Sequence, residues 1–268
     1  MTAIIVVLNV KGGVAKTTTA LNVGYGLGFA GRKVLIVDMD PQCNTSYAIE
    51  STIVFERSML DVMIGIPVPG TTALRRVLLD YTIIQKAKQA PNVWYAPSSI
   101  DLVATDLQIG GLAGRERILS RALSPVLHDF DYVLIDTNPH LGLLAVNAMY
   151  AARDTGMLLP VALNTFALVG FTILERTAQQ LRDNMEIDLP VFGVLPTLHD
   201  GTVVSNKSLV VVQEHFKDKV FPFSIPKNAD IEKAHNAQGC LYTMYPRSKG
   251  AAAYSLASEE VIRRAEKK

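Results

Sequence analysis

Residues 11–18 of the 268-residue chain form a glycine-rich segment that could bind phosphate groups. Gly12 and Gly13 allow a tight turn that presents backbone N–H groups to phosphate oxygens. Lys16 offers a positive charge to the β and γ phosphates, and the hydroxyl of Thr17 is a suitable Mg²⁺ ligand. The segment therefore predicts a site for a nucleoside triphosphate, with ATP and Mg²⁺ as cofactors. The residues expected to bind the nucleotide here are Lys11, Gly12, Gly13, Val14, Ala15, Lys16, Thr17 and Thr18.

Three carboxylates that follow two other apolar runs could complete the chemistry. Phosphoryl transfer requires charge neutralisation, a held metal ion and an aligned water. We expect Thr17 to bind the metal directly, Asp136 to bind it through water, and Asp38 to lie near the metal or its water shell. We expect Asp40 to position and polarise the attacking water. Taken alone, carboxylates at strand ends could equally cap the following helices, and the phosphate loop favours the catalytic interpretation.

The elements that must position these groups follow an alternation of strand and helix. Short runs rich in Val, Ile and Leu are apolar on both faces, which is typical of parallel strands covered by helices on each side. They predict an α/β fold of the P-loop NTPase class, with a mostly parallel twisted sheet, helices on both faces, and residues 1–268 forming one domain. The expected strands are Ile4–Val10, Val34–Asp38, Val93–Ala96, Tyr132–Asp136, Met157–Val161, Val191–Leu195 and Val220–Ile225.

The first crossover helix is expected to begin near Lys16, directly after the phosphate loop, and to stop at Gly31. A glycine there suits a left-handed C-terminal cap. The other expected helices are Arg115–Leu127, Leu141–Ala152, Phe166–Asn184 and Ala251–Arg264.

Composition limits the class of protein without identifying it. Lys and Arg number 26 against 25 Asp and Glu, but residues 201–268 hold 11 basic and 7 acidic residues, so a basic excess lies in the last quarter. The two cysteines, Cys43 and Cys240, lie far apart, which fits no disulfide framework or metal-ligand spacing. The apolar run at residues 1–10 is too short to span a membrane and predicts a buried strand.

The phosphate loop departs from the usual G-x-x-x-x-G-K-[ST] pattern, because Val10 and Ala15 occupy the positions of its two glycines. Read as K-G-G-x-x-K-[ST], it closely resembles the deviant phosphate loop of the ParA and MinD ATPases, in which Ala15 stands where glycine is commoner. Residues 38–42 resemble that family's D-x-D-P-Q box, and residues 132–137 resemble its Walker B strand. The resemblance implies an ATPase with slow intrinsic turnover, whose catalytic residues are Lys11, Lys16 and Asp40. It also implies that Lys11 reaches across an ATP-dependent homodimer to the partner's nucleotide.

Further segments resemble the chromosomal ParA (Soj) proteins in particular. They are residues 160–161, 166–170, 195–197 and 225–228, together with Tyr-Pro-Arg-Ser-Lys-Gly at 245–250. By this resemblance, Thr197 and Pro226 lie where the family builds its adenine pocket. No extra region precedes the first strand, so we expect no helix-turn-helix operator-binding domain.

The resemblance implies non-specific binding to double-stranded DNA and stimulation of hydrolysis by a ParB-like partner. It also implies a cytoplasmic, nucleoid-associated protein that drives plasmid or chromosome segregation. Each basic residue could equally be a solvated surface charge, so the prediction concerns the cluster. The expected DNA-binding residues are Lys207, Lys227, Lys233, Arg247 and Lys249.

Four other kinds of protein share the loop or the chemistry. A MinD-like membrane ATPase requires a strongly apolar C-terminal helix, which residues 259–268 do not offer, so no membrane binding is expected. A nitrogenase-type iron protein holds its cluster with paired cysteines, and Cys43 and Cys240 have no suitable context for this. A scaffold that never hydrolyses ATP need not retain Lys11, Asp38, Asp40 and Asp136 together. A ParA relative that positions a protein cargo remains open, because it uses the same chemistry.

Overall fold

The computed structural model describes residues 2–71, 73–164, 176, 179, 183 and 188–267. Within that part of the chain, seven strands form one sheet in the order β5-β6-β2-β7-β1-β8-β9. All neighbouring strands are parallel except β5 and β6. Their bounds are β1 Ala3–Val7, β2 Val34–Met39, β5 Gln85–Lys86, β6 Val93–Ala96, β7 Tyr132–Thr137, β8 Gly156–Ala162 and β9 Val191–Thr197.

The central strands form because their side chains are apolar on both faces. Every residue of β2, β7 and β8 is buried, as expected for a parallel sheet covered on each side. Six of the seven predicted strands are confirmed, with ends that shift by up to three residues.

The seventh predicted strand, Val220–Ile225, is wrong. Phe221 N donates to Val194 O over 2.9 Å, and Ile225 N donates to Pro196 O over 2.8 Å. Between them Pro222 has no N–H to donate, so the segment forms isolated bridges beside β9 instead of a ladder.

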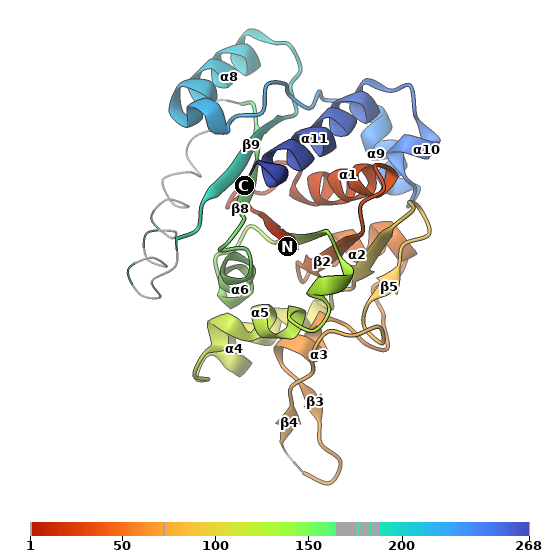
Figure 1. The fold of residues 1–268 in the computed structure, drawn as a ribbon, viewed down its shortest axis with the longest axis vertical. Helices are drawn as coiled ribbons and strands as arrows, with labels where there is room; N and C mark the ends of the chain where they lie inside the picture. The colour runs from red at the N-terminus through yellow and green to blue at the C-terminus, as the bar shows by residue number, and fades with distance from the viewer. Residues whose placement is uncertain are drawn as a thin grey trace.

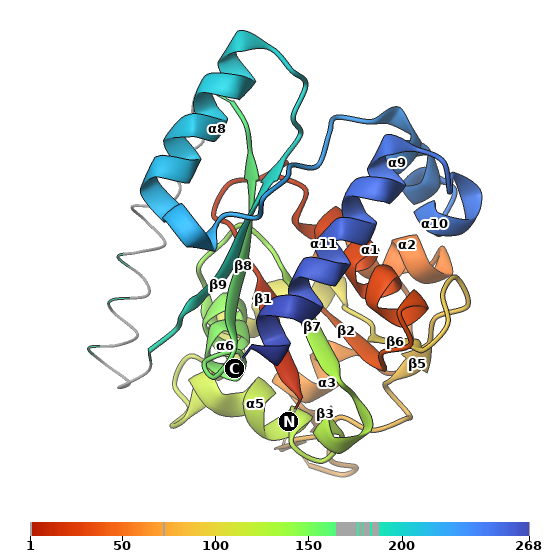
Figure 2. The same ribbon diagram turned by 45° about the horizontal axis from the view of Figure 1, so that its top comes forward.

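Helices cover both faces of the sheet (Figures 1 and 2). One face packs in a single apolar cluster against α1 Lys16–Phe29, α2 Asn44–Glu50, α9 Ala229–Asn236, α10 Leu241–Met244 and α11 Lys249–Glu266. The other face packs against α3 Met59–Met63, α4 Thr105–Ile109, α5 Ile118–Leu123, α6 Leu143–Ala151 and α8 Val203–Phe216. A short hairpin of β3 Ile66–Pro67 and β4 Leu74–Arg75 projects from the α3 end (Figure 1).

The predicted helices agree with the structure to different degrees. The cap of α1 is confirmed, because Gly31 has φ 81° and Arg32 N donates to Leu27 O. The predicted helix Arg115–Leu127 is shorter: it is helical as a 3₁₀ turn followed by α5, which stops at Leu123, just before Pro125. The helix predicted at Phe166–Asn184 lies outside the described residues except at positions 176, 179 and 183. None of the described helices is long and apolar enough to cross a bilayer.

α1 and α11 lie against one another along one face of the sheet (Figure 2). Gly26 makes this approach possible, because a Cβ there would lie 2.1 Å from Ser258 Oγ. Tyr242 OH donates to Asn22 O over 2.9 Å, and Ser258 Oγ donates to Val23 O over 3.3 Å. The helix that begins at the phosphate loop is therefore held along its length by residues from the last quarter of the chain.

Candidate nucleotide-binding site

The phosphate loop leads from β1 to the first turn of α1 at the carboxyl edge of the sheet. β1 lies between β7 and β8 in the sheet. The strands that follow β1 in the chain, β2 and β6, lie on the β7 side of it, whereas the later strands β8 and β9 lie on its other side. The loop after β1 therefore stands at the topological switch point of the sheet. Gly13 has φ 68° and Ala15 has φ 69° and ψ 35°, which are left-handed conformations. Ala15 makes no side-chain cap with the described residues, so the first N–H groups of α1 can meet an anion.

Side chains from neighbouring strands fix the loop. Asn9 Nδ2 donates to Pro160 O over 2.8 Å, and Asn9 Oδ1 accepts from Lys11 N over 3.0 Å. Thr197 Oγ1, at the end of β9, donates to Val14 O over 3.0 Å. The loop is therefore tied to β8 and β9 through buried hydrogen bonds on both sides of its glycines.

Lys16 is held inside the site. Its side chain is largely buried, and its Nζ donates to Lys11 O over 3.1 Å. Burial lowers the pKa of Lys16, while the charges of Asp136 and Asp40 act in the opposite direction. The ammonium therefore lies between the loop and two carboxylates, where phosphate oxygens could replace its carbonyl partner.

Asp136 is fully buried at the end of β7 and presents one oxygen that no described residue satisfies. Its Oδ2 accepts from Thr17 Oγ1 and from Thr45 Oγ1, each over 2.8 Å. Its Oδ1 has no hydrogen-bond partner among the described residues. Burial raises the pKa of Asp136, and the two threonine hydroxyls oppose that rise. An unsatisfied buried carboxylate oxygen beside a threonine hydroxyl is the donor set that Mg²⁺ prefers.

No group of three or more His, Cys, Asp or Glu side chains gathers in the described residues as a metal cage. This fits Mg²⁺, which is usually held by one or two carboxylates together with substrate phosphates and water.

Asp38 is satisfied inside the protein. Its Oδ2 accepts from Ser46 N over 2.8 Å and Ser46 Oγ over 2.6 Å, and its Oδ1 accepts from Asp40 N over 3.1 Å. Burial, together with the charge of Asp136, raises the pKa of Asp38. Ser98 N in turn donates to Ser46 Oγ over 2.9 Å, and Ser98 Oγ donates to Asp40 O over 2.7 Å. This network fixes the backbone of the D-x-D-P-Q segment.

Asp40 differs from Asp38 because it lines a cavity. Its Oδ1 accepts from Gln42 N over 2.9 Å. Burial raises the pKa of Asp40, and the Gln42 hydrogen bond and the Lys16 charge oppose that rise. Asp40 could therefore act on a water or phosphate in the cavity, whereas Asp38 holds the segment that carries it.

The cavity has a volume of about 600 Å³, within the usual range for a small-molecule site. The phosphate loop and Asp40 form one wall, and the segment from Ile225 to Glu232 forms another. Tyr254 of α11 also lines it, and Tyr254 OH lies 3.4 Å from Thr19 Oγ1. The polar end at the loop and the apolar end at Pro226 and Ile231 suit a phosphate group and a base, respectively.

Most of the predicted nucleotide-binding residues line this cavity, and three do not. Those that do are Gly12, Gly13, Ala15, Lys16, Thr17, Thr18 and Pro226, and Asp40 of the predicted catalytic residues lines it as well. Lys11, Val14 and Thr197 lie outside it. Of the two residues predicted for the base pocket, Thr197 does not line the cavity: its side chain is fully buried and its hydroxyl donates to Val14 O.

Other lining residues escaped the sequence analysis. Asn228 belongs to the family-like segment at 225–228, and Leu198 and Ile231 lie within three residues of such segments, so their position could have been inferred from neighbours. Tyr254 lines the cavity because α11 packs on α1, and no local sequence pattern predicts that packing.

Lys11 does not line the cavity of its own chain. Its Nζ donates to Asn164 Oδ1 over 2.9 Å, at the end of β8. A second cleft of about 340 Å³ shares Asp40, Gln42 and Pro139 with the first. Next to it, Ile100, Val103 and Leu107 are 59%, 75% and 91% exposed, so an apolar surface adjoins the nucleotide cavity.

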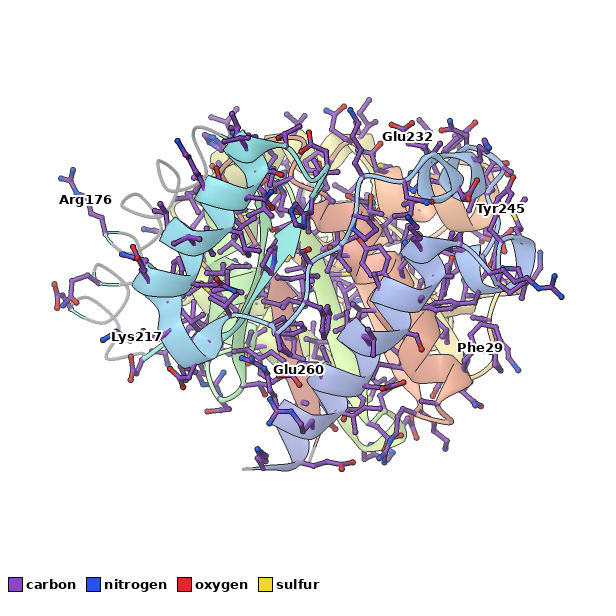
Figure 3. The ribbon with its side chains drawn as sticks, turned by 90° about the horizontal axis from the view of Figure 1, so that it is seen from above. Phe29, Arg176, Lys217, Glu232, Tyr245 and Glu260 are labelled. Carbon is purple, nitrogen blue, oxygen red and sulfur yellow. The ribbon has the colours of Figure 1, made fainter. Side chains whose placement is uncertain are left out.

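The predicted DNA-binding residues divide between separate places. Lys207 lies on α8, and Figure 3 shows Lys217, which follows that helix, on the opposite side of α11 from Tyr245. Lys233 on α9 lies 5.9 Å from the Tyr245 ring and 3.2 Å from Asp230. Arg247 and Lys249 flank the start of α11, which packs on α9. Lys227 lines the nucleotide cavity. Lys233, Arg247 and Lys249 therefore form a group from which Lys207 is separate.

The chain is similar to known proteins over nearly its whole length. Residues 2–191 match the family described as AAA domain. The sporulation initiation inhibitor protein Soj of Bacillus subtilis is 34% identical, with 97% of this chain and 98% of that protein covered. The chromosome partitioning protein ParA of Caulobacter vibrioides is 32% identical, with 97% and 94% covered. A solved structure described as cobyrinic acid a,c-diamide synthase from Mycobacterium smegmatis, with bound ADP and magnesium, is 30% identical with a TM-score of 0.81, covering 99% and 96%.

Proposed function

Because this chain belongs to the Soj/ParA family of P-loop ATPases, we propose that it binds and hydrolyses Mg²⁺-ATP to partition DNA. In this cycle the ATP-bound protein is a homodimer that binds DNA without sequence preference, and a ParB-like partner stimulates hydrolysis. The observation that carries the nucleotide site is the unsatisfied Oδ1 of Asp136 beside Thr17, at the mouth of a loop whose helix N-terminus faces the cavity.

The residues of the loop divide the work of binding. The backbone from Gly12 to Thr18 cradles the phosphates, and Lys16 exchanges its bond to Lys11 O for phosphate oxygens. Thr17 and Asp136 hold Mg²⁺, Asp136 through water, which neutralises charge on the β and γ phosphates. Asp38 keeps Asp40 in place through its bond to Asp40 N. Pro226 and Ile231 contact the base.

Asp40 positions the attacking water. It lines the cavity and retains one oxygen, Oδ2, beyond the bond that Oδ1 makes with Gln42 N. A raised pKa makes this carboxylate a better proton acceptor than an ordinary aspartate, which suits general-base assistance.

A second copy of the chain completes the site. Lys11 lies outside its own cavity, which supports the proposal that it reaches the partner's nucleotide. The exposed apolar surface of Ile100, Val103 and Leu107 lies beside the same cavity and would be buried when two copies meet. ATP therefore favours the dimer, and loss of the γ phosphate releases it.

DNA binding is proposed for the basic group of Lys233, Arg247 and Lys249, with Lys207 on a separate helix. Neutralising backbone phosphates gives affinity that falls steeply with salt and carries no sequence information. Lys227 is the weakest of the five original candidates, because it lines the nucleotide cavity. A protein that binds DNA in this way is cytoplasmic and nucleoid-associated, and its cargo is a plasmid, a chromosome or a protein assembly.

Amide formation of the kind named for the Mycobacterium smegmatis protein is a weaker candidate. Release of ammonia from an amide donor commonly uses a reactive thiolate. Cys43 and Cys240 are both buried, and burial raises the pKa of both thiols, to about 11 for Cys43.

A DNA mobility assay with ATP, ADP and no nucleotide, at low and high salt, tests the proposal. The expected result is a shift with ATP that weakens strongly at high salt, and little shift with ADP or without nucleotide. Light scattering on the same samples should show a dimer only with ATP. Binding that ignores the nucleotide, or a protein that neither retains ATP nor changes its association state, contradicts the proposed cycle.

A further inference from the structure

A groove of about 350 Å³ lies at the end of the molecule remote from the nucleotide cavity, beside the β3–β4 hairpin and α5 (Figure 1). Its floor consists of buried apolar side chains from α3 and α5, including Val62 and Ile118. Leu78 and Leu112 stand over this floor and are 53% and 39% exposed. The groove therefore presents apolar surface to solvent although the side chains beneath it belong to the core.

The two walls of this groove are rigidly joined. Leu79 N donates to Ala122 O over 3.0 Å, which ties the segment after β4 to the end of α5. The guanidinium of Arg121 lies over Gly114, since a Cβ there would come within 3.6 Å of Arg121 Nη2. Arg121 thus lines the groove from α5, and Arg76 lines it from the segment that follows β4.

Arg76 and Arg121 are exposed, and neither makes an ion pair or hydrogen bond with a described residue. The acidic side chains nearby are engaged elsewhere. Asp61 pairs with Arg57, Glu116 pairs with Arg117, and Asp80 accepts from Thr82 N and Oγ1. The positive charge on the two walls is therefore not neutralised within the described part of the chain.

We propose that this groove, which we call the arginine groove (Val62, Arg76, Leu78, Leu112, Ile118 and Arg121), binds an acidic peptide segment of another protein through carboxylates on Arg76 and Arg121 and apolar side chains on its floor. Guanidinium groups bind carboxylates bidentately, and two of them beside an apolar floor select a chain with apolar residues between its acids. This surface is independent of the nucleotide site and of the basic group formed by Lys233, Arg247 and Lys249.

A peptide fits this groove better than a nucleic acid. DNA backbones are bound by polar, strongly basic surfaces that leave little apolar area to bury. Here the space between the arginines is lined by Val, Leu, Ile and Ala side chains, whose burial favours aliphatic groups. Arginine is also among the residues enriched at protein interfaces.

The test uses the full-length protein and a short fluorescein-labelled peptide in which Glu and Leu alternate, followed by fluorescence anisotropy. Arg76→Glu/Arg121→Glu should weaken binding of this peptide roughly tenfold or more. The matched control is Lys33→Glu/Lys219→Glu, which makes the same change in net charge at exposed lysines elsewhere and should bind like the wild type. Circular dichroism and the ATPase rate should be unchanged in both, because neither pair lies near the nucleotide cavity.

Three further measurements separate the possible results. A peptide of alternating Glu and Ser should bind more weakly than the Glu-Leu peptide, and Leu78→Ser should reduce the difference. If the Glu-Leu peptide fails to bind, or binds both double variants equally, the proposal is overturned. If the arginine variant instead loses affinity for a DNA duplex relative to the control while peptide binding is unchanged, the groove is a nucleic-acid surface and the proposal is again overturned.

Discussion

Asp38 and Asp136 are register partners on the neighbouring parallel strands β2 and β7, and both side chains are completely buried. Burial is the main cause of the raised pKa of each, and the charge of Asp136 further raises the pKa of Asp38. Without a cation, two buried carboxyl groups at adjacent strand ends are a source of electrostatic strain, which Lys16 relieves only in part. Mg²⁺ at the unsatisfied oxygen of Asp136 would relieve more of it.

The first prediction concerns Asp136→Asn. With ATP present, Mg²⁺ should raise the Tm of the wild type, because ligand that binds only the folded state stabilises it. In Asp136→Asn this increment should disappear, and the metal-free variant should be at least as stable as the metal-free wild type. Differential scanning fluorimetry with and without Mg²⁺ measures both effects. The control is Asp101→Asn, an exposed carboxylate outside the site, and a full Mg²⁺ increment in the Asp136 variant contradicts the metal assignment.

The second prediction concerns Asp40→Ala. Loss of the carboxylate that positions water should reduce kcat roughly 10²- to 10⁴-fold, the usual range for a general base. ATP binding and ATP-dependent DNA binding should remain, because Asp40 does not hold the phosphates. Phosphate release gives kcat, and equilibrium dialysis gives ATP affinity. The control is Gln42→Ala, which removes a neighbouring uncharged side chain from the cavity. Normal turnover in Asp40→Ala would contradict the role of Asp40 in positioning the water.

The third prediction is that a residue outside the cavity controls nucleotide affinity. Thr197→Val keeps the shape of the side chain but leaves Val14 O without its buried donor, at a cost of about 1–3 kcal/mol. The free energy of unfolding should fall by that order, and affinity for ATP should fall because the loop is no longer tied to β9. Thr197→Ser restores the hydroxyl and should recover most of both. Equal ATP affinity in the Val and Ser variants would show that this bond does not position the loop.

The fourth prediction concerns the left-handed alanine. Ala15 has φ 69°, a conformation that costs a residue with a Cβ about 1–2 kcal/mol. Ala15→Gly should therefore raise the free energy of unfolding by roughly 0.5–1 kcal/mol, the strain relieved less the added entropy of the unfolded chain. Ala30→Gly, at a right-handed position with φ −75° at the end of α1, should instead lower it. Urea titration measures the free energy of unfolding of both variants. A lower value for Ala15→Gly than for the wild type would contradict the proposed backbone strain at Ala15.

The fifth prediction is a pH dependence of stability. Burial lowers the pKa of His235 below its ordinary value of 6.5. As pH falls below about 6.5, the unfolded chain takes up a proton that folded His235 resists, so this residue makes the folded state progressively less stable until its own lowered pKa is passed. His235→Gln removes that contribution. The difference in unfolding free energy between variant and wild type should be constant above pH 7 and shift in favour of the variant toward pH 5. A constant difference throughout would mean that His235 titrates alike in both states.

The sheet and the phosphate loop could be predicted because their signals are local. β2 and β7 are buried on both faces, so their sequences are continuous apolar runs that end in the acidic residues of the site. Gly13 of the loop and Gly31 at the cap both have the left-handed backbone angles that favour glycine. The three short motifs therefore located Thr17, Asp40 and Asp136 correctly at one edge of the sheet.

What escaped the sequence depends on contacts between distant segments. Val220–Ile225 has the composition of a strand, but Pro222 interrupts its donors and it lies outside β9. Thr197 was expected in the cavity, and only the register of β8 and β9 shows that its hydroxyl meets the loop instead. Neither Tyr254 nor the separation of Lys207 from Arg247 has a local signature, because each follows from how helices pack on the sheet.

The cavity is walled both by residues 12–18 and by Tyr254 of α11, while the opposite end of that helix is fastened by Arg264, which donates to the carbonyls of Phe192 and Lys219. During synthesis on the ribosome, the loop and the Walker B strand emerge long before the helix that closes the pocket. A nascent chain therefore cannot load ATP in its final geometry until α11 has left the exit tunnel. Protein synthesis itself thus delays nucleotide binding until the sheet and α11 are assembled.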